Sequence, residues 1–359
     1  MDNLLKAIKK EAKKNLSKIR MNRTSDKNIS KFRNKILYGS KLNVREKKAV
    51  KNYYSQYDIN SQTKFHNLYK RVIGTFDVRF IPENIYGSEI LPSLNQRDHV
   101  PGMADKNIFD KLFFGFNQPL TLIRKIGGEF YNKEYELISK TELENILLTV
   151  KKVIIKPASG SRQGKGIGVF ETEDLSNIIE FLEESGENLI VQDFIKQAES
   201  LRKLNPTSVQ IFRVMTLRLE GKIYYLGSYL SIGRAESKIA NISDNTVNVY
   251  IDECGELSSK SMDSELNIFE SHPDYNYEFT TIPSFYKVIK FSKQLHSKVP
   301  WFDIVGWDIS IDNNENPIFI EMNASFPGVI YPQFFWGPLF GELTEEVLLK
   351  VKKESNKGV

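Results

Sequence analysis

Two acidic residues near the C-terminal end of the sequence could bind a metal ion. Asp308 lies inside the largely apolar run Ile304–Ile311, and Glu321 ends a second apolar run thirteen residues later, followed by Asn323. The turn-forming residues 312–316 predict that the two runs pair as a β-hairpin, with Asp308 beside Glu321. Two carboxylates among apolar neighbours repel each other and are costly to bury unless a cation lies between them. Two carboxylates and an amide oxygen form a ligand set that suits Mg²⁺, whereas two solvent-facing acids on a strand edge would need no ion.

A glycine-rich segment further upstream could hold a phosphate group. Lys156 ends the strand-like run Lys152–Lys156, and the residues 158–168 contain four glycines and two serines. Glycines let backbone N–H groups approach an anion closely, and an adjacent lysine supplies a positive charge. The spacing is neither that of a P-loop nor that of a dinucleotide-binding fingerprint, so a glycine hairpin without a ligand is the alternative. The candidate phosphate ligands in this segment are Lys156, Gly160, Ser161, Gly164, Lys165 and Gly166.

A mixed α/β body that begins near Asp105 must position these residues. We expect helices over 105–116, 141–148, 174–184 and 285–297. We expect strands over 120–124, 152–156, 189–195, 209–220, 223–232, 305–311 and 317–321. Thr141, with Glu144 three residues later, has the spacing of a helix N-cap, and Glu220-Gly221 predicts a tight turn between two strands.

The first 60 residues form a separate basic region. They contain 17 basic and 5 acidic residues, a balance of +12, which leaves −7 for the rest of a chain whose net charge is +5. Apolar residues recur at helical spacing over 4–19 with lysines on the other face, and further helices are expected over 30–37 and 44–57. A helical lobe with a solvated basic face is one interpretation, and docking on an anionic membrane surface through residues 1–24 is a second. Nucleic acid is not expected as a partner, because aromatic residues do not interleave with these charges.

The composition excludes several classes of protein. No run of about 18 apolar residues is present, so no membrane-spanning helix is expected. The N-terminal segment has no apolar signal-peptide core, and the single cysteine, Cys254, allows no disulfide within the chain. These two features together predict a cytoplasmic protein. The four histidines are scattered along the sequence, so neither a zinc nor an iron site is expected.

The sequence resembles the ATP-grasp superfamily, and within it the sugar-transfer-associated branch that is related to teichuronopeptide biosynthesis. Lys156 matches the lysine that ends a strand before the glycine loop, and Lys106 matches the upstream lysine by spacing, with Lys111 as a second candidate. The positions that match the metal ligands are Asp308, Glu321 and Asn323, and those that match the adenine-lining hinge are Gln192, Asp193, Phe194 and Ile195.

Three segments carry the resemblance to this branch. Leu204–Leu217 is similar to the pattern L-N-P-x-S-V-N-x-x-R-x-x-T-L, with Gln210 where asparagine is usual. Residues 76–83 and 104–107 also look like this branch, and the resemblance covers roughly residues 60–340. The loop after residue 234 keeps an asparagine, Asn241, but lacks the acidic residue and the paired glycines that many members carry, which leaves the identity of the acceptor open.

The resemblance implies an α/β (α+β) ATP-grasp fold, in which two lobes grip ATP, preceded by the basic helical region. The implied domains are 1–60, the basic helical region; 61–117, a connecting region; 118–190, a small lobe with the glycine-rich loop; and 191–350, a large lobe with the hinge and the metal site. ATP and Mg²⁺ are the implied cofactors.

The same resemblance implies a carboxylate–amine ligase that forms an amide through an acyl phosphate. Its implied substrates are a small-molecule carboxylate and an amine, linked to sugars in surface-polysaccharide or capsule biosynthesis, at the inner face of the plasma membrane. The residues assigned to the reacting groups are Arg213, Lys238 and Asn241, with a structural ion pair as the alternative for Arg213. A kinase that phosphorylates a sugar or another hydroxyl group, and a non-catalytic scaffold for glycan assembly, are the alternative functions.

Overall fold

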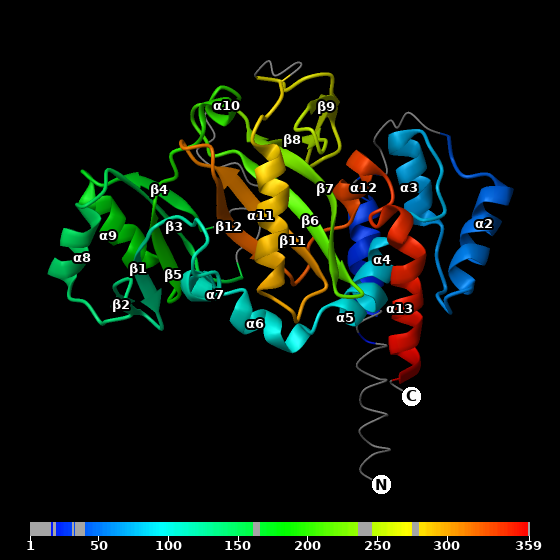
Figure 1. Cartoon of the computed structure of the whole chain (residues 1–359), viewed down its shortest axis with the longest axis horizontal. Coiled ribbons are helices and arrows are strands. Elements are labelled where there is room, and N and C mark those ends of the chain that lie inside the picture. The colour runs from blue at the N-terminus through cyan, green and yellow to red at the C-terminus, as the bar shows by residue number, and fades with distance from the viewer. Residues whose placement is uncertain are drawn as a thin grey trace, which may run out of the picture.

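The computed structural model describes residues 16, 19–30, 32, 40–160, 166–235, 246–274 and 280–357. These residues form a small antiparallel sheet, a large antiparallel sheet and a helical region, which follow one another along the long axis of the molecule (Figure 1). The mixed α/β class expected from the sequence is confirmed. Among the described residues, no helix is long and apolar enough to cross a membrane.

The small sheet has five strands in the order β2-β1-β5-β3-β4. Its strands are β1 (Thr121–Ile126), β2 (Glu129–Tyr131), β3 (Lys152–Pro157), β4 (Gly168–Glu171) and β5 (Leu189–Asp193). Helices α8 (Lys140–Leu147) and α9 (Leu175–Glu184) cover one face, where Val153 and Ile155 pack in the core. Because side chains alternate along a strand, Lys156 lies on the opposite face of the sheet.

The large sheet has seven strands in the order β10-β9-β8-β7-β6-β11-β12. Its strands are β6 (Ile211–Leu219), β7 (Lys222–Gly233), β8 (Thr246–Ile251), β9 (Leu257–Asp263), β10 (Ile268–Phe269), β11 (Ile304–Ile311) and β12 (Pro317–Asn323). Helix α11 (Phe285–Ser297) lies across one face (Figure 1), and its residues Phe285, Val288 and Leu295 are buried there. The opposite face carries the side chains that alternate with this apolar layer.

The helical region packs against one end of the large sheet. Its helices are α2 (Val44–Ser55), α3 (Lys64–Ile73), α4 (Glu83–Ile85), η1 (Tyr86–Ile90), α5 (Leu91–Leu94), α12 (Ile330–Trp336), η4 (Gly341–Leu343) and α13 (Thr344–Lys357). One buried cluster joins Tyr54 of α2, Tyr69 of α3 and Val347 of α13 to Met215 and Leu217 of the sheet. Segments that are far apart in the sequence therefore share one core.

Part of the basic N-terminal region also packs on this core. Residues 19–30 are helical, and Asn28 donates a hydrogen bond to the buried carboxylate of Glu83 over 2.8 Å. The helices expected over 4–19 and 30–37 lie largely outside the described residues. The described part of this region thus belongs to the folded body.

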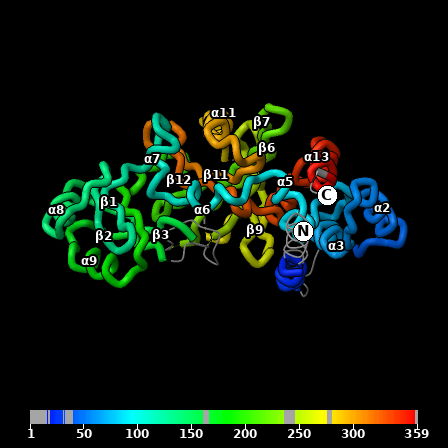
Figure 2. Tube along the Cα trace, turned by 90° about the horizontal axis from the view of Figure 1, so that it is seen from below, coloured from blue at the N-terminus to red at the C-terminus, as the bar shows by residue number. Residues whose placement is uncertain are grey.

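A series of short helices connects the helical region to the small sheet. It contains η2 (Arg97–His99), α6 (Val100–Met103), η3 (Lys106–Ile108) and α7 (Phe109–Leu112), and it runs along one side of the large sheet (Figure 2). The single helix expected over 105–116 is wrong, because a 3₁₀ turn begins at Lys106 and the backbone leaves helical geometry at Phe113. Another short helix, α10 (Glu199–Arg202), follows the small sheet in sequence.

The two hairpins expected from the sequence are both present. Strands β6 and β7 join through Glu220 and Gly221, and both residues have positive φ, as a tight two-residue turn requires. Strands β11 and β12 pair with Asp308 directly opposite Glu321. The second hairpin therefore brings the two candidate metal carboxylates together.

Helix starts around the small sheet follow capping side chains. Ser139 caps α8 and forms a reciprocal capping box with Glu142, so the N-cap expected at Thr141 is wrong. Helix α9 begins after Asp174, whose side chain accepts the backbone N–H of Asn177. Both caps satisfy backbone donors that the first turn of a helix leaves unpaired.

Candidate active site

Four side chains form a row across the large sheet. The strand register pairs Tyr229 of β7 with Arg213 of β6, Arg213 with Asp308 of β11, and Asp308 with Glu321 of β12. Directly opposite residues of antiparallel strands point to the same face, and this is the face that α11 leaves uncovered. Arg213, Asp308 and Glu321 are expected from the sequence, whereas Tyr229 is not.

Asp308 is bound by a nearly buried arginine and an amide. The Nε of Arg213 lies 2.6 Å from Oδ1 of Asp308, and its Nη2 lies 3.2 Å from Oδ2. The Nδ2 of Asn323 donates to the same Oδ2 over 3.2 Å. Burial raises the pKa of Asp308, and the charge of Arg213 opposes that rise. The Asp308 carboxylate is therefore compensated mainly by one guanidinium.

Glu321 is bound by a lysine from the connecting segment. The Nζ of Lys106 lies 2.9 Å from Oε1 of Glu321, and the Lys106 side chain is only 4% exposed. The backbone N–H of Lys106 donates to the carbonyl of Ala158 over 2.8 Å, and Asp105 caps the 3₁₀ turn in which Lys106 lies. The residue that follows β3 therefore holds the backbone of Lys106, while the Lys106 side chain reaches Glu321 on the large sheet.

Lys156 lies close to the same acids. It is 5% exposed and stands on the face of the small sheet that α8 and α9 leave uncovered. Burial lowers the pKa of Lys156 to about 8, the charge of Lys106 adds to the decrease, and the carboxylates of Glu321 and Asp308 oppose it. Two buried lysines and two carboxylates thus interact between the sheets, an arrangement that suits a polyanion bound together with a cation.

The predicted hinge contributes one side chain to this face of the small sheet. Gln192 pairs with Ile154 of β3, so it points to the same side as Lys156. Its Nε2 donates to Oγ1 of Thr121 over 3.3 Å, while its buried Oε1 has no partner among the described residues. Asp193 alternates with it and pairs with Val153 on the helix-covered face, and its backbone N–H donates to the carbonyl of Leu120 over 2.9 Å.

The other two hinge residues follow the end of β5. The backbone N–H of Phe194 donates to the carbonyl of Lys152 over 3.1 Å, and the Nζ of Lys152 lies 4.8 Å from the centroid of the Phe194 ring. Ile195 is half-buried. The chain therefore leaves the small sheet beside a cation–π contact between Lys152 and the Phe194 ring.

The glycine-rich loop is described only at its two ends. Gly160 and Gly166 both have positive φ, of 72° and 76°, a conformation that favours glycine. Ser161, Gly164 and Lys165 lie outside the described residues, as do the candidate substrate residues Lys238 and Asn241. The ends of the loop adjoin Lys156 and β4, so the loop is anchored beside the two lysines.

The oxygen atoms at Asp308, Glu321 and Asn323 suit a hard cation. Over the part of the chain that the structure describes, no group of three or more His, Cys, Asp or Glu side chains could hold a metal ion. The set found here has two carboxylates and one amide, as Mg²⁺ accepts when water and phosphate complete its shell. Because Asn323 uses its amide nitrogen to bond Asp308, its amide oxygen is the atom that could face a cation.

A comparison with protein families agrees with this site. The model of the family described as sugar-transfer associated ATP-grasp matches residues 87–347, which is more than half of the chain. The chain belongs to this family. The resemblance found in the sequence is thereby confirmed, and the two sheets are the two lobes of an ATP-grasp fold.

Solved structures with a similar fold include two ligases and one carboxylase. VanG D-Ala:D-Ser ligase from Enterococcus faecalis has 13% identity and a TM-score of 0.41, over 71% of this ATP-grasp chain and 62% of that chain. L-amino acid ligase from Bacillus licheniformis has 13% identity and a TM-score of 0.40, over 70% of this chain and 48% of that one. The biotin carboxylase domain of Hydrogenobacter thermophilus 2-oxoglutarate carboxylase has 15% identity and a TM-score of 0.45, over 72% and 47%.

These likenesses are distant. The chain spans less than two thirds of the length of each of these three proteins, and their TM-scores are too low to indicate what it acts on. No curated protein matches the chain.

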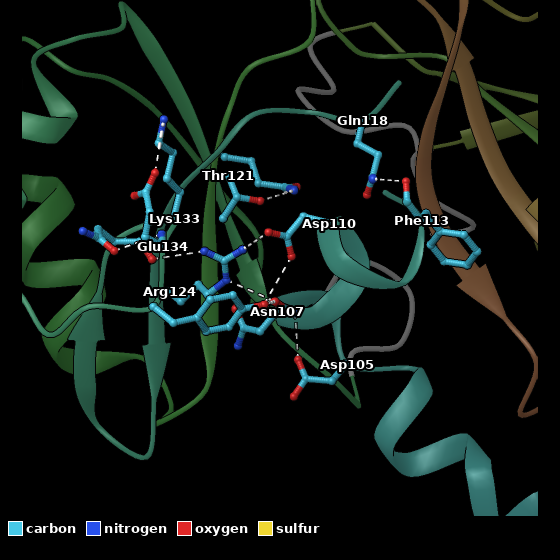
Figure 3. A network of polar contacts seen from close by, with 12 residues as sticks. Asp105, Asn107, Asp110, Phe113, Gln118, Thr121, Arg124, Lys133 and Glu134 are labelled. Atoms are coloured by element: carbon cyan, nitrogen blue, oxygen red, sulfur yellow. Dashed lines mark hydrogen bonds and ion pairs between the residues drawn. The ribbon is translucent and has the colours of Figure 1, made fainter. Parts of the chain in front are cut away.

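Arg124 of this ATP-grasp chain is a further buried cation that the sequence analysis does not identify (Figure 3). Its Nε donates to the carbonyl of Asn107, its Nη1 to the carbonyl of Asn132, and its Nη2 to Oδ2 of Asp110. The Cζ of Arg124 lies 4.1 Å from the centroid of the Tyr135 ring. This cluster fastens the segment that carries Lys106 to β1, so it positions the lysine without being part of the row.

Proposed function

We propose that this chain is an ATP- and Mg²⁺-dependent carboxylate–amine ligase. The observation that supports the proposal most is the meeting of Lys106 and Lys156 with Asp308 and Glu321 between the two lobes. Phosphoryl transfer from a nucleotide requires such a site, because cations must neutralise the charge that spreads over the phosphate oxygens. Family membership adds that the two lobes grip ATP.

The nucleotide would lie between the two lobes. The unpaired Oε1 of Gln192 suits an amino-group donor such as that of adenine, and the backbone of residues 193–195 would complete the hinge. Lys106, Lys156 and the glycine-rich loop would bind the phosphates. Asp308, Glu321 and Asn323 would hold Mg²⁺, which when bound neutralises phosphate charge and orients the transferred group.

Binding of the nucleotide would exchange the partners of the buried cations. In the structure Lys106 pairs with Glu321 and Arg213 pairs with Asp308. Phosphate oxygens would compete for Lys106, and Arg213 would gain a second anion to stabilise. Because a lysine ammonium is a flexible point charge, Lys106 can change partner with little movement of its backbone.

The proposed reaction has two steps. An oxygen of the substrate carboxylate attacks the γ-phosphorus of ATP, and ADP leaves with the electrons of the broken bond. The nitrogen of the amine then attacks the acyl carbon, inorganic phosphate leaves, and the nitrogen loses a proton to give the amide. Arg213 would stabilise the negative charge on the acyl phosphate and on the tetrahedral intermediate. Lys238 and Asn241 are proposed to bind the substrates.

The proposed substrates are a sugar acid or an amino-acid-bearing glycan together with an amine, in the assembly of a surface polysaccharide. We propose a cytoplasmic location, with peripheral contact between residues 1–24 and the anionic inner face of the plasma membrane. Flotation of the whole protein with phosphatidylglycerol liposomes would test this contact. Equal flotation of a protein that lacks residues 1–24 would rule it out.

Trapping of the acyl phosphate tests the ligase proposal. The protein is incubated with Mg-ATP, hydroxylamine and a panel of amino acids and sugar acids, and hydroxamate and ADP are measured together. We expect carboxylate-dependent hydroxamate that disappears in Glu321→Gln and persists in Glu180→Gln, a matched change on the exposed surface of α9. ADP formation with a stable phosphorylated sugar and no hydroxamate would favour the kinase alternative. Failure to bind Mg-ATP would favour the scaffold.

A further inference from the structure

The described part of the basic N-terminal region is fastened to a segment beside the active site. Residues 19–30 form a helix. The Nδ2 of Asn84 donates to Oδ1 of Asn22 over 2.9 Å. The Nδ2 of Asn28 donates to both carboxylate oxygens of Glu83, over 2.8 and 3.0 Å. One face of this helix is therefore bonded at two points, six residues apart, to the chain that leads into the π-helical turn η1.

Met21 of this helix packs beside an aromatic ring of the active-site loop. A Cβ added to Gly87 of η1 would lie 2.9 Å from Sδ of Met21 and 3.2 Å from the ring of Phe326. The Phe326 ring also lies edge to face with the buried ring of Tyr86, at 5.4 Å between centroids. Met21 and Phe326 therefore lie together over Gly87, where the absence of a side chain makes room for both.

Phe326 lies in the loop that joins β12 to α12. The start of this loop is held by Asn95, whose Nδ2 donates to the carbonyl of Ala324 over 2.9 Å. The residue after Phe326 is Pro327, and its carbonyl accepts Nη1 of Arg213 over 3.3 Å. Because Phe326 and Pro327 share a peptide bond, a movement of the Phe326 backbone also moves the carbonyl that binds Arg213.

These contacts connect the N-terminal helix to a reacting group. We infer that Met21 is a positioning residue of the active site, which acts through Phe326 to hold the Pro327 carbonyl and the Arg213 guanidinium in place. A small displacement of a group that stabilises developing charge lowers the rate while the fold remains intact. The inference rests on the proposed ligase function, and it gives the basic N-terminal region a part in the reaction besides the proposed membrane contact.

The two faces of this helix allow both roles at once. Its exposed cations are Arg20, Arg23 and Lys27. Because each residue of an α-helix turns the chain by about 100°, these three lie within one narrow sector. Met21 and Asn28 lie on the opposite side, which faces the core. An anionic surface can therefore reach the cations while the inner face stays packed, so membrane contact does not require the helix to leave the active site.

The test compares two truncations on the inner face of the same helix. Met21→Ala should lower kcat for hydroxamate formation about three- to tenfold and leave the KM for ATP unchanged. Met21→Leu keeps an apolar side chain of similar size and should retain about half of the rate or more. Ile29→Ala is the matched control, because Ile29 is also half-buried but packs on the core of the helical region, about 12 Å further along the helix. It should lower the melting temperature and leave kcat unchanged. Equal kcat values in Met21→Ala and Ile29→Ala would overturn the inference.

A double-mutant cycle shows whether Met21 acts through Phe326. Phe326→Ala should lower kcat at least as much as Met21→Ala does, and the variant with both changes should be no slower than Phe326→Ala alone. Losses that multiply would mean that Met21 affects the rate by another route, and they would overturn the inference. All rates are measured well below the melting temperature of each variant, so that unfolded protein does not contribute.

Hydrogen exchange separates this inference from the ligase proposal, because it needs no substrate. Mass spectrometry of peptides that span residues 324–329 reports how often this loop opens in the free protein. We expect faster exchange in Met21→Ala than in wild type or Ile29→Ala. If no carboxylate gives hydroxamate, the ligase proposal fails and exchange alone decides: faster exchange of the loop in Met21→Ala supports the role of Met21 in positioning it, and unchanged exchange overturns that role.

Discussion

Two arginines of this ATP-grasp chain, the fully buried Arg124 and the nearly buried Arg213, each pair with an aspartate, yet their surroundings differ. Arg124 is bonded by three separate groups, of which two are backbone carbonyls, and it also contacts the Tyr135 ring (Figure 3). Arg213 directs two of its nitrogens to one carboxylate, that of Asp308, and its third contact is a 3.3 Å bond to the carbonyl of Pro327. The contacts of Arg124 therefore hold separate segments of the fold together, whereas the charge of Arg213 is compensated mainly by one anion.

The two aspartates that pair with these arginines differ in their exposure to solvent. The Asp110 side chain is 33% exposed, so water shares the stabilisation of its charge. The Asp308 side chain is 9% exposed, and burial raises its pKa. A carboxylate that is held ionised by one guanidinium can give up that guanidinium when a divalent cation arrives. The difference indicates that the Arg124 pair maintains geometry and that the Arg213 pair takes part in the chemistry.

The largest effect that tests this comparison is on the rate. Asp308→Asn keeps the size of the side chain and an acceptor for Arg213, but it removes the charge that would hold Mg²⁺. We expect the rate of ATP-dependent hydroxamate formation to fall about 10³-fold, or about 4 kcal/mol. The free energy of unfolding should also fall, by about 3 kcal/mol, because the neutral amide leaves the nearly buried guanidinium of Arg213 without its anion. A variant with more than a tenth of the wild-type rate would show that Asp308 is a structural partner of Arg213.

The next effect is on stability. Arg124→Met removes a fully buried cation and leaves the carbonyls of Asn107 and Asn132 without their donor. We expect a loss of about 3–4 kcal/mol in the free energy of unfolding, measured by denaturant titration. Arg213→Met provides the contrast, with a smaller loss of stability and a rate near that of Asp308→Asn. Equal losses of stability in the two variants would remove the distinction between the arginines.

The pairing of Asp308 with Glu321 could be predicted from the sequence, because the apolar runs and the turn residues between them determine the β-hairpin. The apolar runs on either side of residues 312–316 pair as expected, which brings Asp308 opposite Glu321. The inference that buried carboxylates need a cation also holds, although the cations in the structure are the side chains of Arg213 and Lys106. Side-chain ion pairs between distant segments leave no periodic signal in a sequence.

Tyr229 could not be placed from the turn alone. Counting back from the turn, where Leu219 pairs with Lys222, would place Ser228 opposite Arg213. A β-bulge between Met215 and Thr216 shifts the register by one residue, so Tyr229 takes that position instead. Gly227, whose φ is 151°, lies at this bulge inside β7, and a glycine within a strand is the local signal that could have indicated it. Arg124 has no such signal, because its partners come from three segments.

The pH dependence should distinguish Lys156 from both arginines. Because burial and Lys106 lower the pKa of Lys156 to about 8, its charge is lost as the pH rises through that value. We expect kcat/KM for ATP to fall about tenfold per pH unit above pH 8. The arginine of Lys156→Arg keeps its charge at high pH. The kcat/KM for ATP of this variant should therefore stay constant above pH 8, whatever its absolute value. A wild-type profile that is level to pH 9.5 would contradict the proposed contact with phosphate.

The stability of the free protein should change in the opposite direction over this range. The folded pKa of Lys156 lies below its ordinary value of 10.5, so between the two values the unfolded chain binds the additional proton. The contribution of Lys156 to the free energy of unfolding therefore increases from pH 8 to pH 10.5. Denaturant titration of wild type against Lys156→Met would isolate this contribution, since the variant has no proton to exchange at that position.

The smallest effect should come from the glycine behind Arg213. A Cβ added to Gly306 would lie 3.3 Å from Cδ of Arg213, from Sδ of Met215 and from the carbonyl oxygen of Pro327. Gly306→Ala should therefore move the guanidinium by a few tenths of an ångström, lowering the rate about threefold to tenfold at a stability cost of about 1 kcal/mol. Gly102→Ala is the control, because its Cβ would meet no atom within 4 Å. A reduced rate with an unchanged KM for ATP would locate the effect in the chemical step. An unchanged rate would mean that the reaction does not depend on the exact position of the Arg213 guanidinium.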